Sequence, residues 1–454
     1  MQFELTKEFL DELRDAISEG RDTFLVETLE QLHPADIAEV FDKLKPGESN
    51  YLFKLVPSDK SADVMIELDE DDREKLMATL TSKEIAEQVI DLIDSDDAAD
   101  VIAELPKQKQ GEVISHITDA EQQIAVSDLL RYDEDSAGGI MAKELVKVKR
   151  NWTIARSIRE MRKQAEGVNQ VYTIYVVDDN DRLVGKLSLK KLLFSSSSIK
   201  TLISDIYTEE ELNFVTPDEN GEDCAKLMEK YDLVALPVVD EDMTLLGRIT
   251  IDDVVDLIKE EAERDYQLAS GISESVESDD TVWVLTRARL PWLLIGLLGG
   301  VLVAQVIGIF EVQLAKVAAL MLFVPLIAAM GGNVGVQSSA IVVQGLANKS
   351  LDTSGIFVKL FKELAVASLN GLICGGVIFL YGVLFLDSMA LSYTVGTALF
   401  AVIIIAAIFG TIVPLLLDKV KIDPALATGP FITTMNDIIG LSVYFLFAKL
   451  FFQI

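Results

Sequence analysis

An aspartate lies in the middle of the last apolar stretch of the chain, where a charged side chain is costly. Asp437 falls within residues 424–450, a segment long enough to cross a bilayer as a helix. A carboxylate at the bilayer centre costs about 2.5 kcal/mol or more, so we expect it to face protein or water and to be functional. Pro430, Thr433 and Thr434 share its helical face and form a polar stripe. A structural hydrogen bond to a neighbouring helix is the alternative interpretation of Asp437.

A second polar motif, GGNVGVQS at residues 331–338, lies inside an earlier apolar stretch. Three glycines and two amides weaken a membrane helix, and non-helical backbone at that depth is tolerated only where it is buried or lines a wet cavity. We therefore expect a bent or broken helix whose carbonyl oxygens are available to the water shell of a metal ion. Close helix packing through small residues is the alternative.

The available ligands in the membrane half are carboxylate, amide and carbonyl oxygens, which suit a hard cation. The sequence there has no cluster of His, Cys or Met that a soft metal would favour. Mg²⁺ dehydrates reluctantly and keeps several waters, so a pore with few acids and many acceptors fits hydrated Mg²⁺. Composition alone does not separate Mg²⁺ from Ca²⁺, Mn²⁺ or Co²⁺.

Charge is distributed very unevenly along the 454 residues, whose net charge is −33. From Arg287 onward there are 9 basic and 7 acidic residues, against 31 and 66 in the remainder. The first half is therefore strongly acidic, which argues against nucleic acid as a partner and suits cations. Residues 1–10 do not resemble a secretory signal, and Cys224 and Cys374 lie in different halves, so we expect the first half in the cytoplasm.

Residues 1–135 show helical periodicity, with a loosely repeated pattern in which an acid precedes an apolar face. The pattern begins at Asp36, Asp63 and Asp100, which predicts stacked short helices in a small solenoid or bundle. His33 and His116 have no Cys or His neighbour and are expected to be structural or surface residues.

Residues 136–258 contain a clearer repeat. The run Ile174–Asp178 and the following Gly185 recur about 62 residues later as Leu236–Asp240 and Gly247, each unit reading helix, strand, turn, strand, helix. This resembles a tandem pair of CBS domains, an α/β regulatory module. An acidic helix and a polar linker follow at 259–286, in the position of a lever between a sensor and a membrane domain.

Residues 287–454 hold five apolar stretches, about 290–310, 313–345, 364–386, 393–417 and 424–450, which predict five membrane-spanning helices. With the N-terminal half inside, Arg287, Arg289 and Lys419 fall on the cytoplasmic side and Asp387 outside, in agreement with the positive-inside rule. The C-terminus is then expected outside the cell membrane.

The combination is similar to the MgtE family of bacterial magnesium channels over nearly the whole chain. The matching motifs are His33–Asp36, Asp135–Gly139, Thr250–Asp253, Gly331–Asn333, Asp423–Leu426 and Asn436-Asp437. The resemblance implies a homodimer in the lipid bilayer with the pore between protomers. It implies that Asp437 from each chain holds a hydrated Mg²⁺, that the carbonyls of Ala329 and Gly332 support it, and that Asp423 lies near the cytoplasmic mouth.

The family also implies negative feedback, in which cytoplasmic Mg²⁺ binds between the N domain, the CBS pair and the connecting helix and closes the pore. Carboxylates brought together repel, and a divalent ion makes the compact arrangement favourable. A solvated helix face is the alternative for any single acid. The matching acids are Asp63, Asp96, Asp232, Asp252, Asp253, Asp256 and Glu261.

Three positions depart from the family pattern. Arg264 occupies an expected acid position on the connecting helix, and Gly429 stands where some relatives have Asn. Some members bind ATP in the CBS cleft, and Thr250 and Asp253 have the spacing used to hold a ribose. The first unit has Ser188 but carries Lys191 in the Asp position, which argues against ATP binding here.

We therefore interpret the chain as a Mg²⁺-selective channel for magnesium uptake that Mg²⁺ itself closes, and not as an enzyme, because no nucleophile–base set or phosphate-binding loop is evident. One alternative is a secondary cation transporter, which should carry a second ionisable group deep in the membrane, where the sequence indicates only Asp437. Another is a CBS-regulated anion channel, which should show helix N-termini or cationic groups at midplane, and none is evident. A membrane-anchored divalent metal sensor would need no midplane acid.

Overall fold

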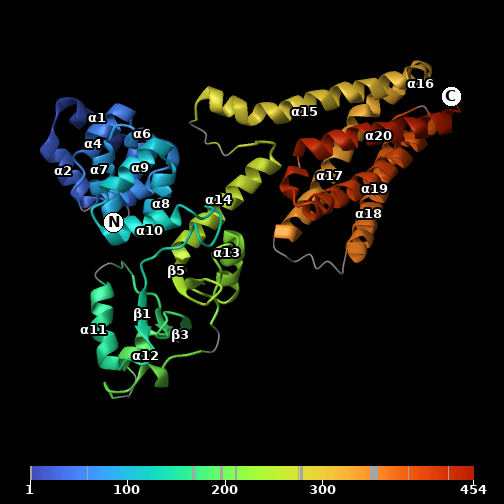
Figure 1. The fold of residues 1–454 in the computed structure, drawn as a ribbon. Helices are drawn as coiled ribbons and strands as arrows, with labels where there is room; N and C mark the ends of the chain where they lie inside the picture. Colours follow the sequence, from blue (N-terminus) through green and yellow to red (C-terminus); the bar gives the residue numbers. More distant parts are fainter. Residues whose placement is uncertain are drawn as a thin grey trace. The chain divides into compact units, whose positions relative to one another are not determined.

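The protein is described here from a computed structural model. The described residues are 3–453, apart from 59, 166, 167, 169, 195–197, 210, 211, 275, 277–279, 348–355, 387 and 428. They divide into two compact units, residues 1–258 and 259–454, and each unit is described by itself (Figure 1).

The first part of unit 1 is built from short helices, which confirms the predicted helical N domain. Their starts are capped by side chains: Thr6 accepts from Phe9 N, Thr81 from Glu84 N and Asp119 from Glu121 N. His33 caps its helix with Nδ1 ahead of Pro34, which is the structural role expected of it. The elements are α1 (Lys7–Glu19), α2 (Asp22–Gln31), α3 (Pro34–Asp42), α4 (Pro46–Phe53), α5 (Ser61–Glu67), α6 (Glu70–Met77), α7 (Ser82–Gln88), η1 (Ile90–Leu92), α8 (Ser95–Ala103), α9 (Lys107–His116) and α10 (Ala120–Leu129).

Long-range side-chain hydrogen bonds reveal the period of this helical domain. Among the described residues up to 135, the side-chain hydrogen bonds between residues more than ten positions apart all join residues that are 27–32 positions apart in the sequence. Each helix layer is thus tied to its equivalent about one repeat later, as in a small solenoid. Lys60 and Lys109 show the device best, because each ammonium group donates to the free carbonyls at the end of an earlier helix.

The CBS region contains two sheets. Parallel β1 and β2 and antiparallel β3 form one, and antiparallel β4 and β5 form the other. Ile174 and Val176 of β2 pack with α11 and α12, whereas Tyr175 and Val177 on its other face pack with Val239 of the second unit. The elements are β1 (Val146–Lys149), α11 (Ile154–Gln164), β2 (Ile174–Val177), β3 (Leu183–Leu187), α12 (Leu189–Phe194), η3 (Ile203–Asp205), α13 (Gly221–Lys230), β4 (Ala235–Val239) and β5 (Leu245–Thr250).

An aspartate follows the equivalent strand in each of the two repeated units, and both aspartates make the same hydrogen bonds. Asp178 accepts from the backbone N–H groups of Asn180 and Arg182, and Asp240 accepts from those of Asp242 and Thr244. Each carboxylate therefore closes the same tight turn between two antiparallel strands. This equivalence confirms the tandem CBS pair predicted from sequence.

One helix, α14 (Ile251–Ala269), runs on directly from β5 and continues past the boundary between the units. It is the predicted acidic connecting helix. At 1.5 Å per residue its 19 residues extend about 28 Å. In unit 2 its C-terminal end is fixed to the following segment, because the Gln267 amide exchanges two hydrogen bonds with the backbone of Val276.

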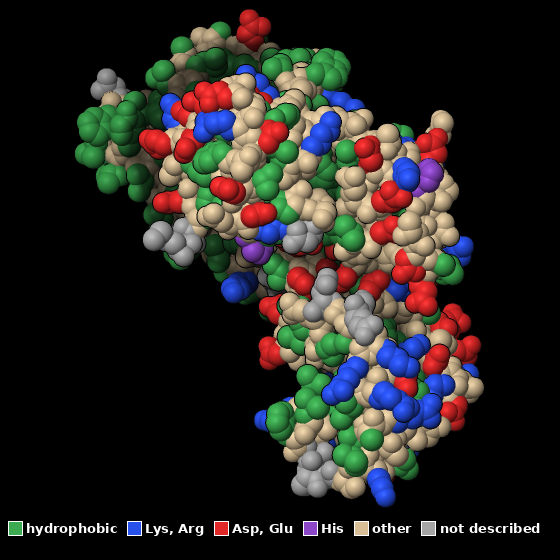
Figure 2. Space-filling model, turned by 90° about the vertical axis from the view of Figure 1, so that its left-hand side faces the viewer, with side chains coloured by type: hydrophobic (Ala, Val, Ile, Leu, Met, Phe, Trp, Pro, Cys, Tyr) green, Lys and Arg blue, Asp and Glu red, His purple; other side chains and the backbone are tan. Residues whose placement is uncertain are grey.

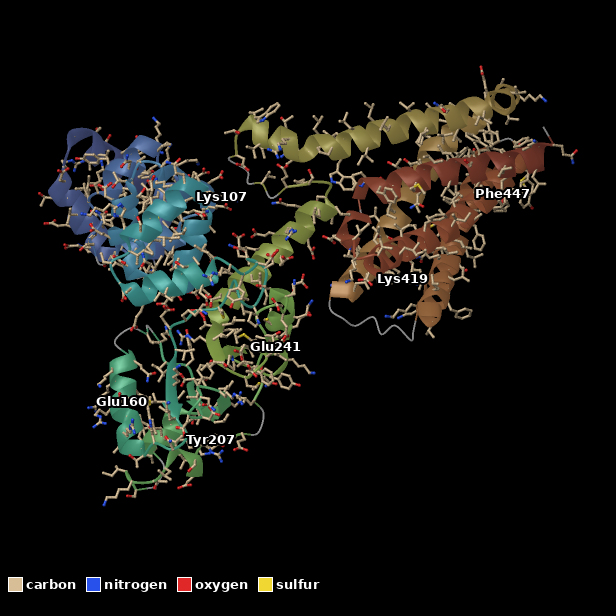
Figure 3. The ribbon with its side chains drawn as sticks, viewed as in Figure 1. Lys107, Glu160, Tyr207, Glu241, Lys419 and Phe447 are labelled. Atoms are coloured by element: carbon tan, nitrogen blue, oxygen red, sulfur yellow. The ribbon has the colours of Figure 1, made fainter. Side chains whose placement is uncertain are left out.

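The described residues of unit 2 contain five helices long and apolar enough to cross a membrane, as predicted. Their outward faces are apolar: Leu293 is 66% exposed and Leu372 67%, as befits contact with lipid. Lys419, labelled in Figure 3, ends the helix that precedes the last span. The elements are α15 (Val282–Ile309), α16 (Glu311–Lys316), η4 (Ala318–Phe323), α17 (Val324–Ala347), α18 (Ile356–Phe385), α19 (Met389–Lys419), η6 (Pro424–Ala427) and α20 (Gly429–Phe452).

The expected break at residues 331–338 is wrong, because α17 is continuous from Val324 to Ala347. The irregular part of the second span is instead the 3₁₀ turn η4 before it. The glycines serve close packing: a Cβ on Gly335 would lie 1.9 Å from the Asn436 amide nitrogen, and one on Gly410 would lie 2.4 Å from the Gly335 carbonyl oxygen. The alternative interpretation, close helix packing through small residues, is therefore the one that the structure supports.

The repeat-to-repeat lysine contacts generate a prediction for the stability of the N domain. Lys60 Nζ donates to the carbonyls of Glu30 at 2.8 Å and Leu32 at 2.6 Å. Lys60→Ala should therefore destabilise α2 by about 1.5–3 kcal/mol, because charge-assisted hydrogen bonds are lost and carbonyls are left unpaired. Faster amide exchange in residues 25–32 of the full chain would show it.

Lys83→Ala is the matched control. Lys83 is exposed and, among the residues that the structure describes, pairs with Glu87 on its own helix, so its removal should change exchange little. Equal effects of the two substitutions would contradict the proposed role of Lys60.

Candidate functional site

An acidic cluster forms in unit 1 where the N domain meets the CBS pair. The first turn of α8 supplies Asp96 and Asp97, preceded by Asp94 at the N-cap position. Ser95 joins this turn to the CBS region, because its backbone N–H and hydroxyl donate to Glu144 Oε2 at 3.2 and 2.9 Å. The Ser95 hydroxyl oxygen in turn accepts from Lys143 N at 2.9 Å. The start of α8 is thus docked on the segment that leads into β1.

The first turn of α14 supplies the other half of the cluster. Asp253 Oδ2 accepts from Thr250 N at 3.2 Å and from Thr250 Oγ1 at 2.6 Å, which fixes the carboxylate at the start of the helix. Asp252 is the exposed neighbour. Arg248 is only 4% exposed and donates to Gln170 O at 2.9 Å, with its guanidinium 5.6 Å from the Tyr172 ring centroid. It is one of the cations that offset part of the negative charge, and Arg73, which lies near Asp97, is another.

Burial and mutual repulsion raise the pKa of the α8 carboxyls. Burial, then the charge of Glu144, raises the pKa of Asp94 to about 6, although Arg248 opposes the shift. Burial, then the charge of Asp253, raises the pKa of Asp97 to about 7, and the same two causes hold the pKa of Asp96 well above 3.8. The α8 and α14 carboxylates therefore face each other closely enough to repel.

The acidic cluster is a local feature and not only a result of composition. The first CBS unit, residues 141–206, contains 13 basic and 7 acidic residues. Its α11 exposes Arg156, Arg159, Arg162 and Lys163, and Figure 2 shows basic side chains gathered over this unit. The acids near α8 and α14 thus lie together although basic residues are plentiful in the same module.

Three of the seven regulatory acids predicted from sequence belong to the cluster: Asp96, Asp252 and Asp253. The others lie elsewhere. Asp63 is exposed on α5, Asp232 is exposed with φ 50° after α13, Asp256 is exposed one turn further along α14, and Glu261 lies in unit 2. Glu261 accepts from Arg264 Nη1 at 3.5 Å, so the departure at Arg264 supplies a partner for it.

Sequence reasoning missed Asp94, Asp97 and Glu144. The two aspartates carried a usable signal, since Asp94-Ser95-Asp96-Asp97 places acids at the N-cap and first turn of an apolar helix. Glu144 gave none, because it lies 49 residues from Ser95. Within the described parts of the chain, no three His, Cys, Asp or Glu side chains are arranged to hold one metal ion directly.

In unit 2, Asp437 lies half-buried in α20, eight residues after the helix begins. No described residue makes a hydrogen bond or ion pair with it, so its charge is free to interact with a cation. The stripe around it packs closely: Thr434 contacts α15 at Gly299, and Thr433 lies against Gly332 of α17. Pro430 lies in the first turn of α20, where it breaks no helical hydrogen bond.

The other predicted pathway residues occupy different settings. Ala329 and Gly332 belong to the continuous helix α17. Asp423 is exposed before η6, where its carboxylate accepts from Ala425 N at 2.7 Å and stabilises the turn into α20. Asp423 thus has a structural role just before the start of the span that carries Asp437.

The C-terminal end of α14 contacts the start of α20. A Cβ on Gly429 would lie 2.7 Å from the carbonyl oxygen of Ala269, and one on Gly271 would lie 3.0 Å from Pro430. Gly429 and Gly271 have φ of 48° and 80°, a conformation that favours glycine. Gly429, noted as a departure from the family pattern, is therefore required by this approach of two backbones.

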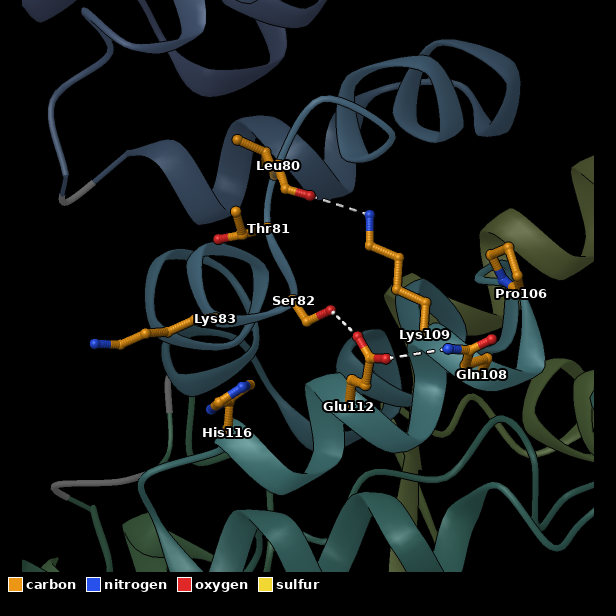
Figure 4. A pocket seen from close by; sticks show the side chains of 9 residues that line it. All are labelled: Leu80, Thr81, Ser82, Lys83, Pro106, Gln108, Lys109, Glu112 and His116. Atoms are coloured by element: carbon orange, nitrogen blue, oxygen red, sulfur yellow. Dashed lines mark hydrogen bonds between the residues drawn. The ribbon is translucent and has the colours of Figure 1, made fainter.

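A groove of about 590 Å³ in the N domain is lined by residues of α7 and α9, including Lys83 and His116 (Figure 4). Its polar groups are largely paired with one another. Glu112 accepts from Ser82 and Gln108, and Lys109 donates to Leu80 O. The groove therefore offers no carboxylate cluster comparable to that at α8.

Comparison with known proteins supports assignment of the chain to the MgtE family along nearly its whole length. Sequence profiles match an intracellular N domain of MgtE at residues 32–135, CBS domains at 137–198 and 203–260, and a divalent cation transporter domain, MgtE, at 324–447. The magnesium transporter MgtE of Thermus thermophilus is 33% identical over 443 residues, covering 96% of this chain and 97% of that protein.

Two further relatives agree. The magnesium transporter MgtE of Bacillus subtilis is 32% identical over 319 residues, covering 70% of this chain and 69% of that protein. A solved structure of the cytosolic domain of the Mg²⁺ channel MgtE in complex with ATP is 32% identical. It covers 55% of this chain and 99% of that chain, with a TM-score of 0.51.

The pKa shifts in the acidic cluster predict a pH dependence. These carboxyls keep their protons to higher pH in the folded protein than in the unfolded chain, so folding takes up protons between pH 3.8 and about 7. The protonated carboxyls therefore stabilise the folded protein at low pH, and this stabilisation is lost as the pH rises from 3.8 to about 7. In the metal-free full chain, the unfolding temperature of the N domain should fall between about pH 4 and 7.

The double substitution Asp96→Asn and Asp97→Asn should flatten this dependence and raise the unfolding temperature at pH 8, because it removes two repelling charges. Glu12→Gln, on the exposed face of α1, is the control and should leave the profile unchanged. A profile that is already flat in the wild-type chain would contradict the shifted pKa values.

Proposed function

Because the chain belongs to the MgtE family of magnesium transporters, we propose that it is a Mg²⁺-selective channel for magnesium uptake that cytoplasmic Mg²⁺ closes. Transport is passive, driven by the concentration gradient and by the inside-negative potential, which supplies about 2.3 kcal/mol per charge per 100 mV. The acidic cluster at α8 and α14 is the single observation that carries the gating part of this proposal.

In the membrane domain, Asp437 attracts the permeating ion. Its half-buried carboxylate has no protein partner among the described residues, and a second copy of the chain would contribute the same group across a homodimer. Mg²⁺ would retain most of its waters, so the carboxylates and the carbonyls of Ala329 and Gly332 act on its hydration shell. Asp423 would mark the cytoplasmic mouth.

In the cytoplasmic half, Mg²⁺ is the regulator. Asp96, Asp97 and Asp253 repel one another when the site is empty of cations, and this repulsion weakens the docking of α8 on the CBS pair. A hydrated divalent cation removes the repulsion and favours the docked arrangement, which we assign to the closed channel. Asp63, Asp232, Asp256 and Glu261 are candidates for further regulatory ions, as expected from the family.

Helix α14 transmits the change. Its first turn carries Asp252 and Asp253, and its C-terminal end contacts the start of α20, which carries Asp437. A helix is stiff over this length, so a displacement at one end must move the other or break the helix. Docking of the N domain would thereby fix the position of the pore helix.

We assign residues 1–135 to the N-terminal regulatory domain, 136–258 to the CBS pair, 259–286 to the connecting segment and 287–454 to the pore domain. The N-terminal half is then cytoplasmic and the C-terminus lies outside the cell. ATP is bound by the cytosolic domain of one relative. Here Lys191 N donates to Ser188 Oγ in the first unit, and no acid stands at that position, so we do not propose ATP as a ligand.

A secondary cation transporter is the second candidate, and one observation favours it. Glu363 lies seven residues inside α18 and is a second ionisable group within a candidate span. Its carboxylate already accepts from the Ser338 hydroxyl at 2.5 Å, which supports a structural use and leaves the channel as the preferred function.

Flux into liposomes reconstituted with the full chain tests this proposal. Wild-type protein should conduct Mg²⁺ when the cytoplasmic side is Mg²⁺-free, and millimolar Mg²⁺ on that side should suppress the flux. Asp437→Asn should lower the open-state flux at least about tenfold, equivalent to ~1.4 kcal/mol of lost stabilisation of the permeating ion.

Asp418→Asn is the control, because Asp418 is an exposed acid at the end of α19. It should leave the flux unchanged. Unaltered flux in Asp437→Asn would remove this residue from the pathway, and a folded wild-type protein without flux would favour a metal sensor.

A further inference from the structure

Besides Asp437, one acid of unit 2 lies well inside a described membrane-spanning helix. It is Glu363 of α18, to which no role has been given so far in the ion pathway. Asp437 is eight residues from the start of α20, and Glu363 is seven residues from the start of α18. At 1.5 Å per residue these depths are about 12 and 10 Å. Because successive spans are expected to alternate in direction, both helices start on the same side, and the two carboxylates lie at similar distances from those starts.

The partner of Glu363 is on the neighbouring span. Ser338 of α17 is 4% exposed, and its hydroxyl donates to Glu363 Oε1 at 2.5 Å. A short bond from a buried hydroxyl to a carboxylate is charge-assisted, and such a bond inside an apolar layer is expensive to break. It therefore fixes the position of α17 relative to α18.

The same stretch of α17 is held on its other sides by α19 and α20. A Cβ on Gly410 of α19 would lie 3.0 Å from Ser338 Cβ. One turn earlier, Gly335 leaves room for the side chain of Asn436, which is 2% exposed and adjoins Asp437. Neither Asn436 amide atom has a hydrogen-bond partner among the described residues. Among the described residues, the α17–α20 contact near Asn436 is therefore held by close packing without a hydrogen bond. The hydrogen bond that α17 makes in this region is the one from Ser338 to Glu363 of α18.

We propose that Glu363 is a positioning residue for the ion pathway. Its carboxylate holds Ser338, and through it the Gly331–Gly335 face of α17, at the height where α17 meets Asn436 and Asp437. Loss of the bond lets α17 slide or rotate against α20, because glycine contacts and an unpaired amide resist such a shift weakly. The proposal rests on the proposed transport function, since positioning matters only if this layer carries the ion.

Four variants of the full chain in nanodiscs and liposomes test it. Ser338→Ala and Glu363→Ala each remove the bond. The double variant removes both partners of the same hydrogen bond. Glu363→Gln keeps an acceptor of the same shape but removes the charge. We expect the first three to accelerate amide exchange in residues 331–339 and to lower Mg²⁺ flux about tenfold, with the double variant no worse than either single one. Glu363→Gln should stay within about twofold of wild type in both measurements.

Ion discrimination supplies a readout that general destabilisation would not move. A displaced α17 should change the ratio of Co²⁺ to Mg²⁺ flux in Ser338→Ala and Glu363→Ala, and Glu363→Gln should restore the wild-type ratio. Unchanged exchange in Glu363→Ala would overturn the proposal, and so would changed exchange with unchanged flux and ratio. Loss of flux in Glu363→Gln with normal flux in Ser338→Ala would also overturn it, since the charge would then act directly.

The proposed function fails separately. If the wild-type chain carries no Mg²⁺ flux, the channel assignment is lost and the pathway role of Glu363 falls with it. Amide exchange would still decide whether the Ser338–Glu363 bond fixes α17.

Discussion

In the proposed channel, coupling between the acidic cluster and the pore depends on the continuity of helix α14. The first turn of α14 carries two of the carboxylates in the acidic cluster, and its last residues lie against the start of the helix that carries Asp437. In the proposed mechanism this helix bends little, so that a displacement at its first turn is passed on to its last turn. The two left-handed glycines at its far end, Gly271 and Gly429, allow backbone to meet backbone there, and side chains at those positions would loosen the link.

The other constraint is the instability of the acidic cluster. Burying several carboxylates at the start of α8 is unfavourable, and the raised pKa values of Asp94, Asp96 and Asp97 express that cost. A protein that only needed a stable N domain would place apolar or neutral residues there. In the proposed channel, this unfavourable charge would make docking of α8 depend on a bound cation, as a sensor of cation concentration requires.

Much of the fold was predictable because its signals are local. Apolar stretches of about 20 residues predict the five spans, and the turn aspartates Asp178 and Asp240 mark the CBS repeat.

The site was predicted only in part. Asp96, Asp252 and Asp253 came from the family pattern, whereas Glu144 reaches the cluster through a contact 49 residues away that no local pattern reveals. The glycine motif was harder still, because glycines at 331, 332 and 335 fit either a broken helix or close packing, and only Asn436 and Gly410 on other spans decide between them. Glu363 was missed for the same reason, because its partner Ser338 lies 25 residues away on another span.

Interrupting α14 tests directly whether this helix couples Mg²⁺ binding to closure of the pore. Glycine at positions 259, 262 and 263 should soften the helix between its two contact ends at a cost of about 1 kcal/mol per glycine, while Lys259→Ala with Glu263→Ala keeps it helical. The measurement is the Mg²⁺ dependence of flux in liposomes alongside calorimetric Mg²⁺ binding. We predict that the glycine variant binds regulatory Mg²⁺ like wild type but is no longer closed by it, and that the alanine variant closes normally. Closure of the glycine variant at the wild-type Mg²⁺ concentration would contradict the account.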